Sequence, residues 1–191
     1  MNCFIRRVAD VLDNDKPGLA AGEYAMLYCD VVRFKAINDT FGSIEGDKLL
    51  RYIARFFQDH MGEGGYVSRM GGDRFVAFVR KKGEALEKLL KEYFDAVAAY
   101  PLVYEVVSNM GIYVTTAEIL CVEAMIDRAN IAFSEIKGNY AEKYRFFDEE
   151  QRNAMLGEQE IVGMMTTALA EGQFVLNYQP QYDHATKKMV G

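Results

Sequence analysis

Two aspartates in this sequence stand where carboxylates can bind a metal ion. Asp30 lies near the end of an apolar run at residues 24–32, and Asp73 follows two glycines in SRMGGDRFVAF, residues 68–78. Mg²⁺ usually accepts one or two carboxylates and completes its shell with phosphate and water. If the two strands are neighbours in one sheet, Asp30 and Asp73 predict a magnesium–phosphate site. Both residues also fit ordinary turns, in which Asp is common.

The glycine pair before Asp73 predicts the tight turn of a β-hairpin. Gly71 and Gly72 have no side chains, so the backbone can turn sharply and approach a ligand closely. Arg74 comes directly after Asp73. Its guanidinium offers positive charge to a phosphate, or it pairs with Asp73 and competes with a metal ion.

A second polar segment, RFKAINDTFGSIEGDKLL at residues 33–50, leads into a helix. A loop at a helix N-terminus can bind phosphates through its amides. Asn38 and Asp47 together have the donors and acceptors needed to recognise guanine. Taken alone, Asn38 is equally compatible with a turn and Asp47 with an exposed position on a helix.

Hydrophobic spacing predicts how these residues are positioned. We expect a loop at 13–23, a bend near Gly111 and an α/β (α+β) sandwich, with helices over a central, mostly antiparallel sheet, as in palm-like and ferredoxin-like domains. The predicted helices are 2–13, 44–60, 86–97 and 118–137, and the predicted strands are 24–32, 66–70, 74–80, 102–116 and 143–148.

Composition narrows the function classes. Of 191 residues, 50% are hydrophobic, which predicts a globular protein, and a formal charge of −6 argues against a general nucleic-acid binder. The sequence has neither a membrane-length apolar run nor a signal peptide, which predicts a cytoplasmic chain whose membrane anchor, if any, lies elsewhere in a longer protein. Cys29 and Cys121 have apolar neighbours and are expected in the core as reduced thiols.

The segments CDVVRFKAINDTFGSIEGDKLL and RMGGDRF together resemble the GGDEF domain of bacterial diguanylate cyclases. Two separated motifs agree in order and in predicted secondary structure, and the resemblance covers about residues 1–147. It implies the palm-like nucleotide cyclase fold, Mg²⁺ or Mn²⁺ as cofactor and GTP as ligand. It also implies a homodimer, because the cyclase reaction joins two GTP molecules held face to face.

The resemblance also implies roles for individual residues. Metal would be bound by Asp30, Asp73 and the carbonyl of Val31, and guanine by Asn38 and Asp47. The GTP phosphates would bind to the backbone amides of Arg33, Phe34 and Lys35. Gly71 and Gly72 would line the substrate site.

Four positions depart from the family pattern. Arg74 replaces the glutamate that cyclisation requires, and Val32 replaces a second aspartate. The inhibitory product site, Arg-x-x-Asp, would fall at residues 62–65, which read GEGG. Ser134 is aligned with the phosphate-binding lysine, and Lys137 is expected to be a poor substitute.

The end of the chain resembles the start of an EAL phosphodiesterase domain, including the segment YQP at residues 178–180. We therefore expect a degenerate GGDEF domain at 1–147, a linker helix at 148–171 and an N-terminal EAL fragment at 172–191. The fragment lacks the EAL catalytic residues, so we expect no phosphodiesterase activity from these 191 residues.

These features predict an Mg²⁺–GTP-binding domain that regulates an EAL domain of the same polypeptide. Two alternatives stay open at this point. The domain is an active diguanylate cyclase that tolerates Arg74, or it is a purely structural dimerisation module.

Overall fold

The computed structural model describes residues 2–103, 105–118 and 120–149, together with residues 153, 162–165, 167–173, 180, 183–184, 186 and 189. The chain divides into two compact units, Met1–Arg152 and Asn153–Gly191. In the second unit, Gly172 has a φ of +68° and the Gln173 amide donates to the Ala168 carbonyl at 2.9 Å, as is typical of a helix C-terminus. Most of the predicted linker helix and EAL fragment lies outside the described residues, and their boundaries stay predictions.

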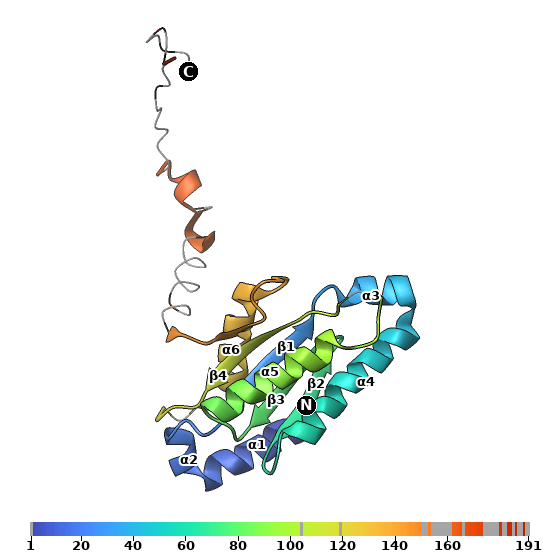
Figure 1. The fold of residues 1–191 in the computed structure, drawn as a ribbon. Coiled ribbons are helices and arrows are strands. Elements are labelled where there is room, and N and C mark those ends of the chain that lie inside the picture. The colour runs from blue at the N-terminus through green and yellow to red at the C-terminus, as the bar shows by residue number, and fades with distance from the viewer. Residues whose placement is uncertain are drawn as a thin grey trace. The chain divides into compact units, whose positions relative to one another are not determined.

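The first unit is built on a five-stranded sheet with the order β2-β3-β1-β4-β5 (Figure 1). Only the pairing of β4 with β5 is parallel, so the predicted mostly antiparallel sheet is confirmed. The strands are β1 (Ala25–Val31), β2 (Tyr66–Gly71), β3 (Arg74–Val79), β4 (Ser108–Val114) and β5 (Tyr144–Phe146).

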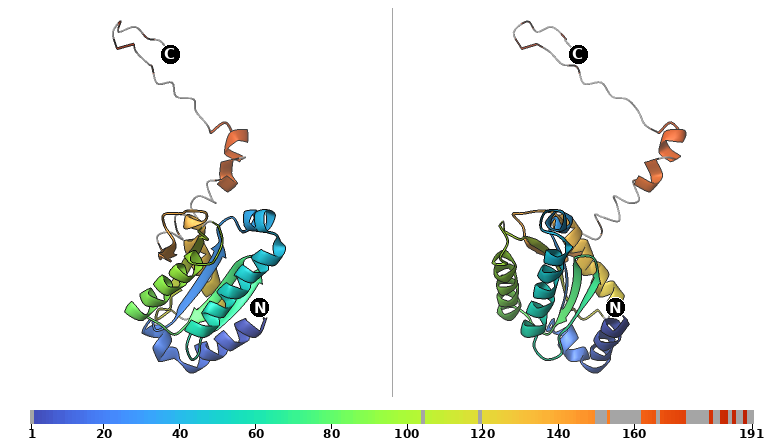
Figure 2. Two further views of the ribbon diagram at one scale, coloured as in Figure 1. Left: turned by 45° about the vertical axis from the view of Figure 1, so that its right-hand side comes forward. Right: turned by 90° about the vertical axis from the view of Figure 1, so that its right-hand side faces the viewer.

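Helices cover both faces of this sheet, which makes the predicted sandwich (Figure 2). One face packs against α1 (Asn2–Asn14), α2 (Lys16–Ala20) and α6 (Val122–Ile136). The other packs against α3 (Phe34–Phe41), α4 (Ser43–His60) and α5 (Glu84–Ala98). No helix within the described part of the chain is both long and apolar enough to cross a membrane.

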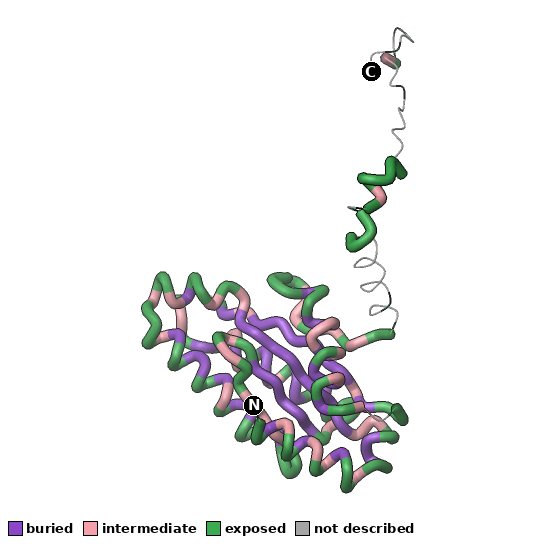
Figure 3. Tube along the Cα trace, turned by 180° about the vertical axis from the view of Figure 1, so that it is seen from behind, coloured by how far each residue is buried: buried purple, intermediate pink, exposed green. Residues whose placement is uncertain are grey.

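All seven residues of β1 are buried, which explains why its sequence is apolar apart from Asp30, and Figure 3 shows the buried interior of the sheet. Alternate side chains point to opposite faces: Leu27 and Cys29 join the α4–α5 core, whereas Met26 and Tyr28 join the α1–α6 core. The strand β1 thus contributes side chains to both hydrophobic cores, and its last residues lie at one end of the sheet.

Helices form in residues 13–23, which we predicted as a loop, and in residues 33–43, where we predicted no helix. In residues 13–23, Asp15 caps α2 by accepting a hydrogen bond from the Gly18 amide at 3.1 Å, and Pro17 occupies the first turn. Pro is favourable there because the first amides of a helix have no intrahelical partner. In residues 33–43, α3 begins directly after Arg33.

The prediction of a buried cysteine is confirmed for Cys29 and is wrong for Cys121, which is exposed at the start of α6. That helix begins four residues later than we predicted, and β4 begins at Ser108 rather than at residue 102.

The predicted bend at Gly111 is wrong. Gly111 pairs in register with Tyr28 on one side and Arg145 on the other, so the strand continues through it. A Cβ atom here would collide with the Ala129 carbonyl oxygen and the Phe133 backbone nitrogen of α6. The glycine is there because α6 lies directly on the strand.

We expect Gly111→Ala to lower the free energy of unfolding by about 3 kcal/mol, because the colliding atoms are backbone and cannot rotate away. Chemical denaturation of the purified protein measures this change. Gly163→Ala is the control, since a Cβ at that helical position meets nothing within 4 Å. Equal stability of Gly111→Ala and the unmodified protein would contradict the close packing of α6 on β4.

Candidate nucleotide and metal site

The hairpin and β1 bring Asp73 and Asp30 to the same end of the sheet. The strands β1 and β3 pair from Ala25↔Val79 to Cys29↔Phe75, and Asp30 and Arg74 come next along them. The residues Gly71 and Arg74 pair across the turn and leave Gly72 and Asp73 as a two-residue loop.

The turn needs its glycines. Gly71 has a φ of +138° and Gly72 a φ of +59°, both unfavourable for other residues. A positive φ at the first loop residue alone is the pattern of a type II′ hairpin turn. Arg69 secures the turn by donating from Nε to the Gly72 carbonyl at 2.6 Å, a contact that the sequence did not predict.

The negative charge of Asp73 acts electrostatically on Asp30. Asp30 is only 7% exposed, and burial followed by the negative charge of Asp73 raises the pKa of its carboxyl to about 6. The charges of Lys137 and Arg74 act in the opposite direction but do not cancel these effects. A divalent cation would reduce the remaining excess of negative charge, so the pair of carboxylates fits Mg²⁺.

The donor set also agrees with this ion. The described residues hold no cluster of three or more His, Cys, Asp or Glu side chains able to bind a metal. A carboxylate pair alone suits an ion that takes its other ligands from phosphate and water. Val31, the third expected ligand through its carbonyl, is buried in β1 directly after Asp30.

Arg74 is exposed, and its positive charge lowers the pKa of Asp30. Among the described residues it forms no ion pair with Asp73 within 4 Å, so the predicted competition by direct pairing is not seen. A guanidinium group has hydrogen-bond donors and no acceptor, so Arg74 cannot take a proton from a reacting hydroxyl.

The expected phosphate-binding amides lie at the start of α3. Arg33 has a φ of +55°, the only positive φ of a non-glycine residue in the described chain, and its carbonyl accepts from the Ala36 amide at 2.8 Å. Phe34 and Lys35 form the first turn, whose amides have no carbonyl partner within the helix. The Arg33 guanidinium lies over the Tyr140 ring, 5.9 Å from its centroid.

The two residues expected to recognise guanine lie on helices that touch. Asn38 Oδ1 is held against Gly46, where any Cβ would collide with it, and Asp47 follows Gly46. This Oδ1 is buried and has no hydrogen-bond partner among the described residues. A buried polar atom without a partner is costly, and such atoms are found at sites with a role beyond stability.

Asp47 is exposed and lines a surface hollow of about 460 Å³ between α4 and β2. Arg51 and Arg69 contribute positive charge to the same hollow, and Leu50 and Phe75 contribute apolar surface. The hollow therefore offers a carboxylate, cations and apolar contacts to one ligand.

Lys137, which we expected to substitute poorly for the phosphate-binding lysine, lies at the end of α6. It follows α6 directly, and its charge reaches Asp30. Ser134, expected at the lysine position, instead donates to the Asn130 carbonyl at 2.7 Å within α6.

The segment aligned with the inhibitory product site has no side chains able to form it. Gly62 and Gly64 have φ values of +76° and +75°, and a Cβ on Gly65 would lie 2.5 Å from Met61 Cβ. An aspartate at Gly65 would therefore require a rearrangement of the loop after α4.

The family model described as "Diguanylate cyclase, GGDEF domain" matches residues 12–143. The chain belongs to this family. The matched range contains both carboxylates, the hairpin turn and the α3–α4 segment.

Two curated relatives illustrate the similarity. Signaling protein YkoW of Bacillus subtilis is 28% identical over 177 residues, 87% of this chain and 22% of that protein. The bifunctional diguanylate cyclase/cyclic di-GMP phosphodiesterase MucR of Pseudomonas aeruginosa is 28% identical over 174 residues, 88% of this chain and 25% of that protein. The chain thus spans about a quarter or less of the length of these relatives.

Among solved structures, the GGDEF domain of YfiN (TpbB) from Pseudomonas aeruginosa superimposes with a TM-score of 0.66 at 21% identity, over 82% of this chain and 94% of that one. This likeness confirms the nucleotide cyclase fold predicted from the sequence.

We expect Asp30→Asn to stabilise the metal-free domain above pH 6. The pKa of Asp30 is about 6 in the folded protein and near 3.8 unfolded, so the wild type loses stability as pH rises between these values. The gain at pH 8 should be about 1–3 kcal/mol and should vanish near pH 4.

Denaturation with a chelator at both pH values tests this expectation. Asp127→Asn, on the exposed side of α6, is the control. If Asp30→Asn were less stable than the wild type at pH 8, the ionised Asp30 carboxylate would not be a source of instability.

Proposed function

We propose that this GGDEF domain binds Mg²⁺–GTP without converting it efficiently, and that it regulates an EAL phosphodiesterase domain of the same polypeptide in cyclic di-GMP signalling. The observation that carries the proposal is the burial of Asp30 at the same end of the sheet as Asp73, where burial and then the charge of Asp73 raise the pKa of Asp30 to about 6. A buried carboxylate with a strongly raised pKa is typical of a functional site.

The surrounding residues support a nucleoside triphosphate as the ligand. Amides of Phe34 and Lys35 and the ammonium group of Lys137 supply positive electrostatic potential for phosphates. Asn38 and Asp47 supply hydrogen-bonding groups for the base. A carboxylate accepts from both N1–H and the exocyclic amine of guanine, whereas adenine has no N1–H, so GTP should be preferred over ATP.

Arg74 is the reason to propose binding rather than turnover. In the cyclisation reaction, a 3′-hydroxyl attacks an α-phosphate and must lose its proton. The family has an acidic residue at the position of Arg74. An arginine can attract phosphate but cannot take up that proton. The similarity to MucR, whose name combines both activities, supports an adjoining phosphodiesterase as the regulated partner.

We expect Asp47→Ala to weaken Mg²⁺–GTP binding about 10- to 150-fold, the cost of losing a hydrogen-bonded charged group. Isothermal titration calorimetry with GTP and ATP measures the affinities, and Asp127→Asn serves as control. Equal affinity for GTP and ATP, or an Asp47→Ala protein that binds GTP normally, would refute the proposed base site. No GTP binding by the wild type would favour a structural module.

We expect no detectable cyclic di-GMP from the wild type with GTP and Mg²⁺, and at most weak synthesis from Arg74→Glu. Val32 also departs from the family pattern, and groups that act in one transition state are not additive. Product is measured by chromatography at high protein concentration, where dimers form. Arg74→Ala is the control, because it removes the charge without adding a carboxylate. Robust synthesis by the wild type would instead establish an active cyclase.

A further inference from the structure

Asn109 is a buried polar residue near the start of β4, between Ser108 and the apolar Met110. It lies in β4, its exposed fraction is 0%, and its neighbour Met110 is a core residue. Burying an amide is unfavourable unless it is fully hydrogen-bonded. The side-chain partners of Asn109 therefore indicate what it does.

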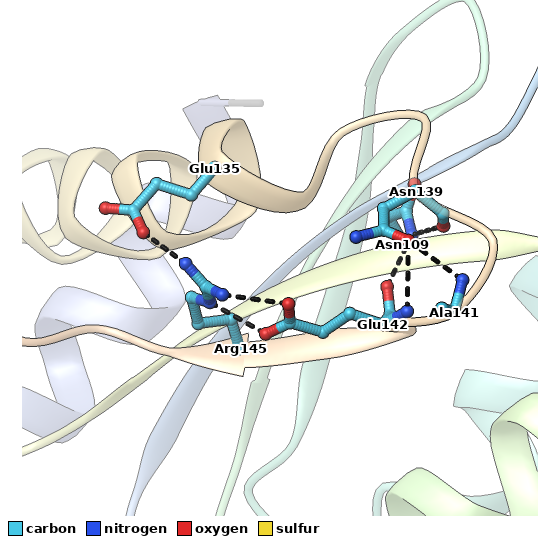
Figure 4. A network of polar contacts seen from close by, with 6 residues as sticks. All are labelled: Asn109, Glu135, Asn139, Ala141, Glu142 and Arg145. Atoms are coloured by element: carbon cyan, nitrogen blue, oxygen red, sulfur yellow. Dashed lines mark hydrogen bonds and ion pairs between the residues drawn. The ribbon is translucent and has the colours of Figure 1, made fainter. Parts of the chain in front are cut away.

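The side-chain hydrogen bonds of Asn109 go to the loop after α6. Figure 4 shows those to Asn139 and Glu142. Asn109 Nδ2 donates to the Asn139 carbonyl at 2.8 Å and to the Glu142 carbonyl at 3.1 Å. Its Oδ1 accepts from the Gly138 amide at 2.8 Å. One buried side chain thus satisfies three backbone groups of a five-residue stretch.

Other polar contacts fix the same loop from within. The Asn139 side chain accepts from the amides of Ala141 at 2.8 Å and Glu142 at 3.2 Å. Arg145 of β5 binds both oxygens of Glu142, at 2.7 and 2.8 Å, and also pairs with Glu135 of α6. Figure 4 shows these contacts joining α6, the loop and β5.

The loop carries two residues that reach the candidate site. Lys137 begins it and acts on Asp30, while Tyr140 lies under the guanidinium of Arg33 at the start of α3. Asn109 is paired directly with Asp30 across β1 and β4, and paired residues share one face of a sheet. The anchor of the loop therefore lies beside the carboxylate whose pKa Lys137 lowers, and the Lys137 ammonium lies over the Phe133 ring, 5.8 Å from its centroid.

We propose that Asn109 is a positioning residue for nucleotide binding: it holds loop 137–142 so that Lys137 faces the phosphate side of the acid pair and Tyr140 supports Arg33. This inference rests on the proposed binding of Mg²⁺–GTP. Asn109 itself touches neither phosphate nor metal and acts through Lys137. Nothing in the sequence motifs assigns it a role.

A double-mutant cycle separates positioning from simple stabilisation. We expect Asn109→Ser to weaken Mg²⁺–GTP binding about 5- to 10-fold and Lys137→Met about 10-fold. In the Asn109→Ser protein, Lys137→Met should cost twofold or less, because the lysine has already lost its place. Calorimetry is done at a temperature at which every variant is folded.

Two further variants control for the fold. Thr115→Val removes another buried hydrogen bond near the opposite end of β4, from Thr115 Oγ1 to the Tyr24 carbonyl, and should leave GTP affinity within twofold. Asn139→Ala loosens the loop from its exposed side, and we expect it to weaken binding in the same direction as Asn109→Ser.

Hydrogen exchange without ligand tests the anchor separately. The amides of Gly138 and Glu142 should exchange at least tenfold faster in Asn109→Ser and unchanged in Thr115→Val. Unchanged exchange, additive effects of Asn109→Ser and Lys137→Met, or normal GTP affinity of Asn109→Ser would each overturn the positioning role. Absence of GTP binding by the wild type would instead refute the proposed function, and the nucleotide role of Asn109 with it.

Discussion

The burial of Asp30 is the constraint on which the rest of the site depends. The strand β1 packs two cores, and therefore its end is buried and a carboxylate there is largely removed from water. An ionised carboxylate in that place is unfavourable unless positive charge is supplied. Asp73 makes the imbalance larger, while Lys137 and Arg74 reduce it. The local structure is thus organised around a negative charge that a bound cation would stabilise.

The sequence predicted those elements whose cause is local or periodic. The strand β1, the hairpin around Gly72 and the amphipathic helices α1, α4 and α5 follow from apolar spacing and turn chemistry. The prediction that Asp30 and Asp73 lie at the same end of the sheet needed one assumption, that their strands are neighbours. The strands β1 and β3 are indeed neighbours in the sheet.

What the sequence did not predict depends on contacts between distant segments. Gly111 was taken for a bend because only the packed structure reveals α6 above it. The charge of Lys137 acts on Asp30 because the end of α6 lies near β1, a proximity that the sequence did not predict. Asn109 gave no signal, since a single polar residue in a strand has no periodicity and its partners are 29 to 33 positions away along the chain.

In the proposed function, Arg74 separates nucleotide binding from turnover within one fold. A hairpin side chain is exposed, so its replacement leaves the cores, the turn and the acid pair in place. What changes is the charge next to Asp30, from an acid in the family pattern to a base here. The family resemblance of the fold therefore says little about catalysis, which depends on individual side chains at the site.

The loop beside the acid pair is held differently from the sheet that it adjoins. The strand β5 has only three residues, and the contacts that fix loop 137–142 to β4 are hydrogen bonds of Asn109 rather than apolar packing. Hydrogen bonds are directional and each of these has a single geometry, whereas apolar contacts tolerate sliding. A loop fixed in this way can place one ammonium group accurately while contributing little to the core. The hydrophobic cores thus stabilise the fold, whereas the hydrogen bonds of Asn109 position the polar loop. For this reason a substitution of Asn109 should change ligand affinity more than a substitution elsewhere in β4 that costs the same stability.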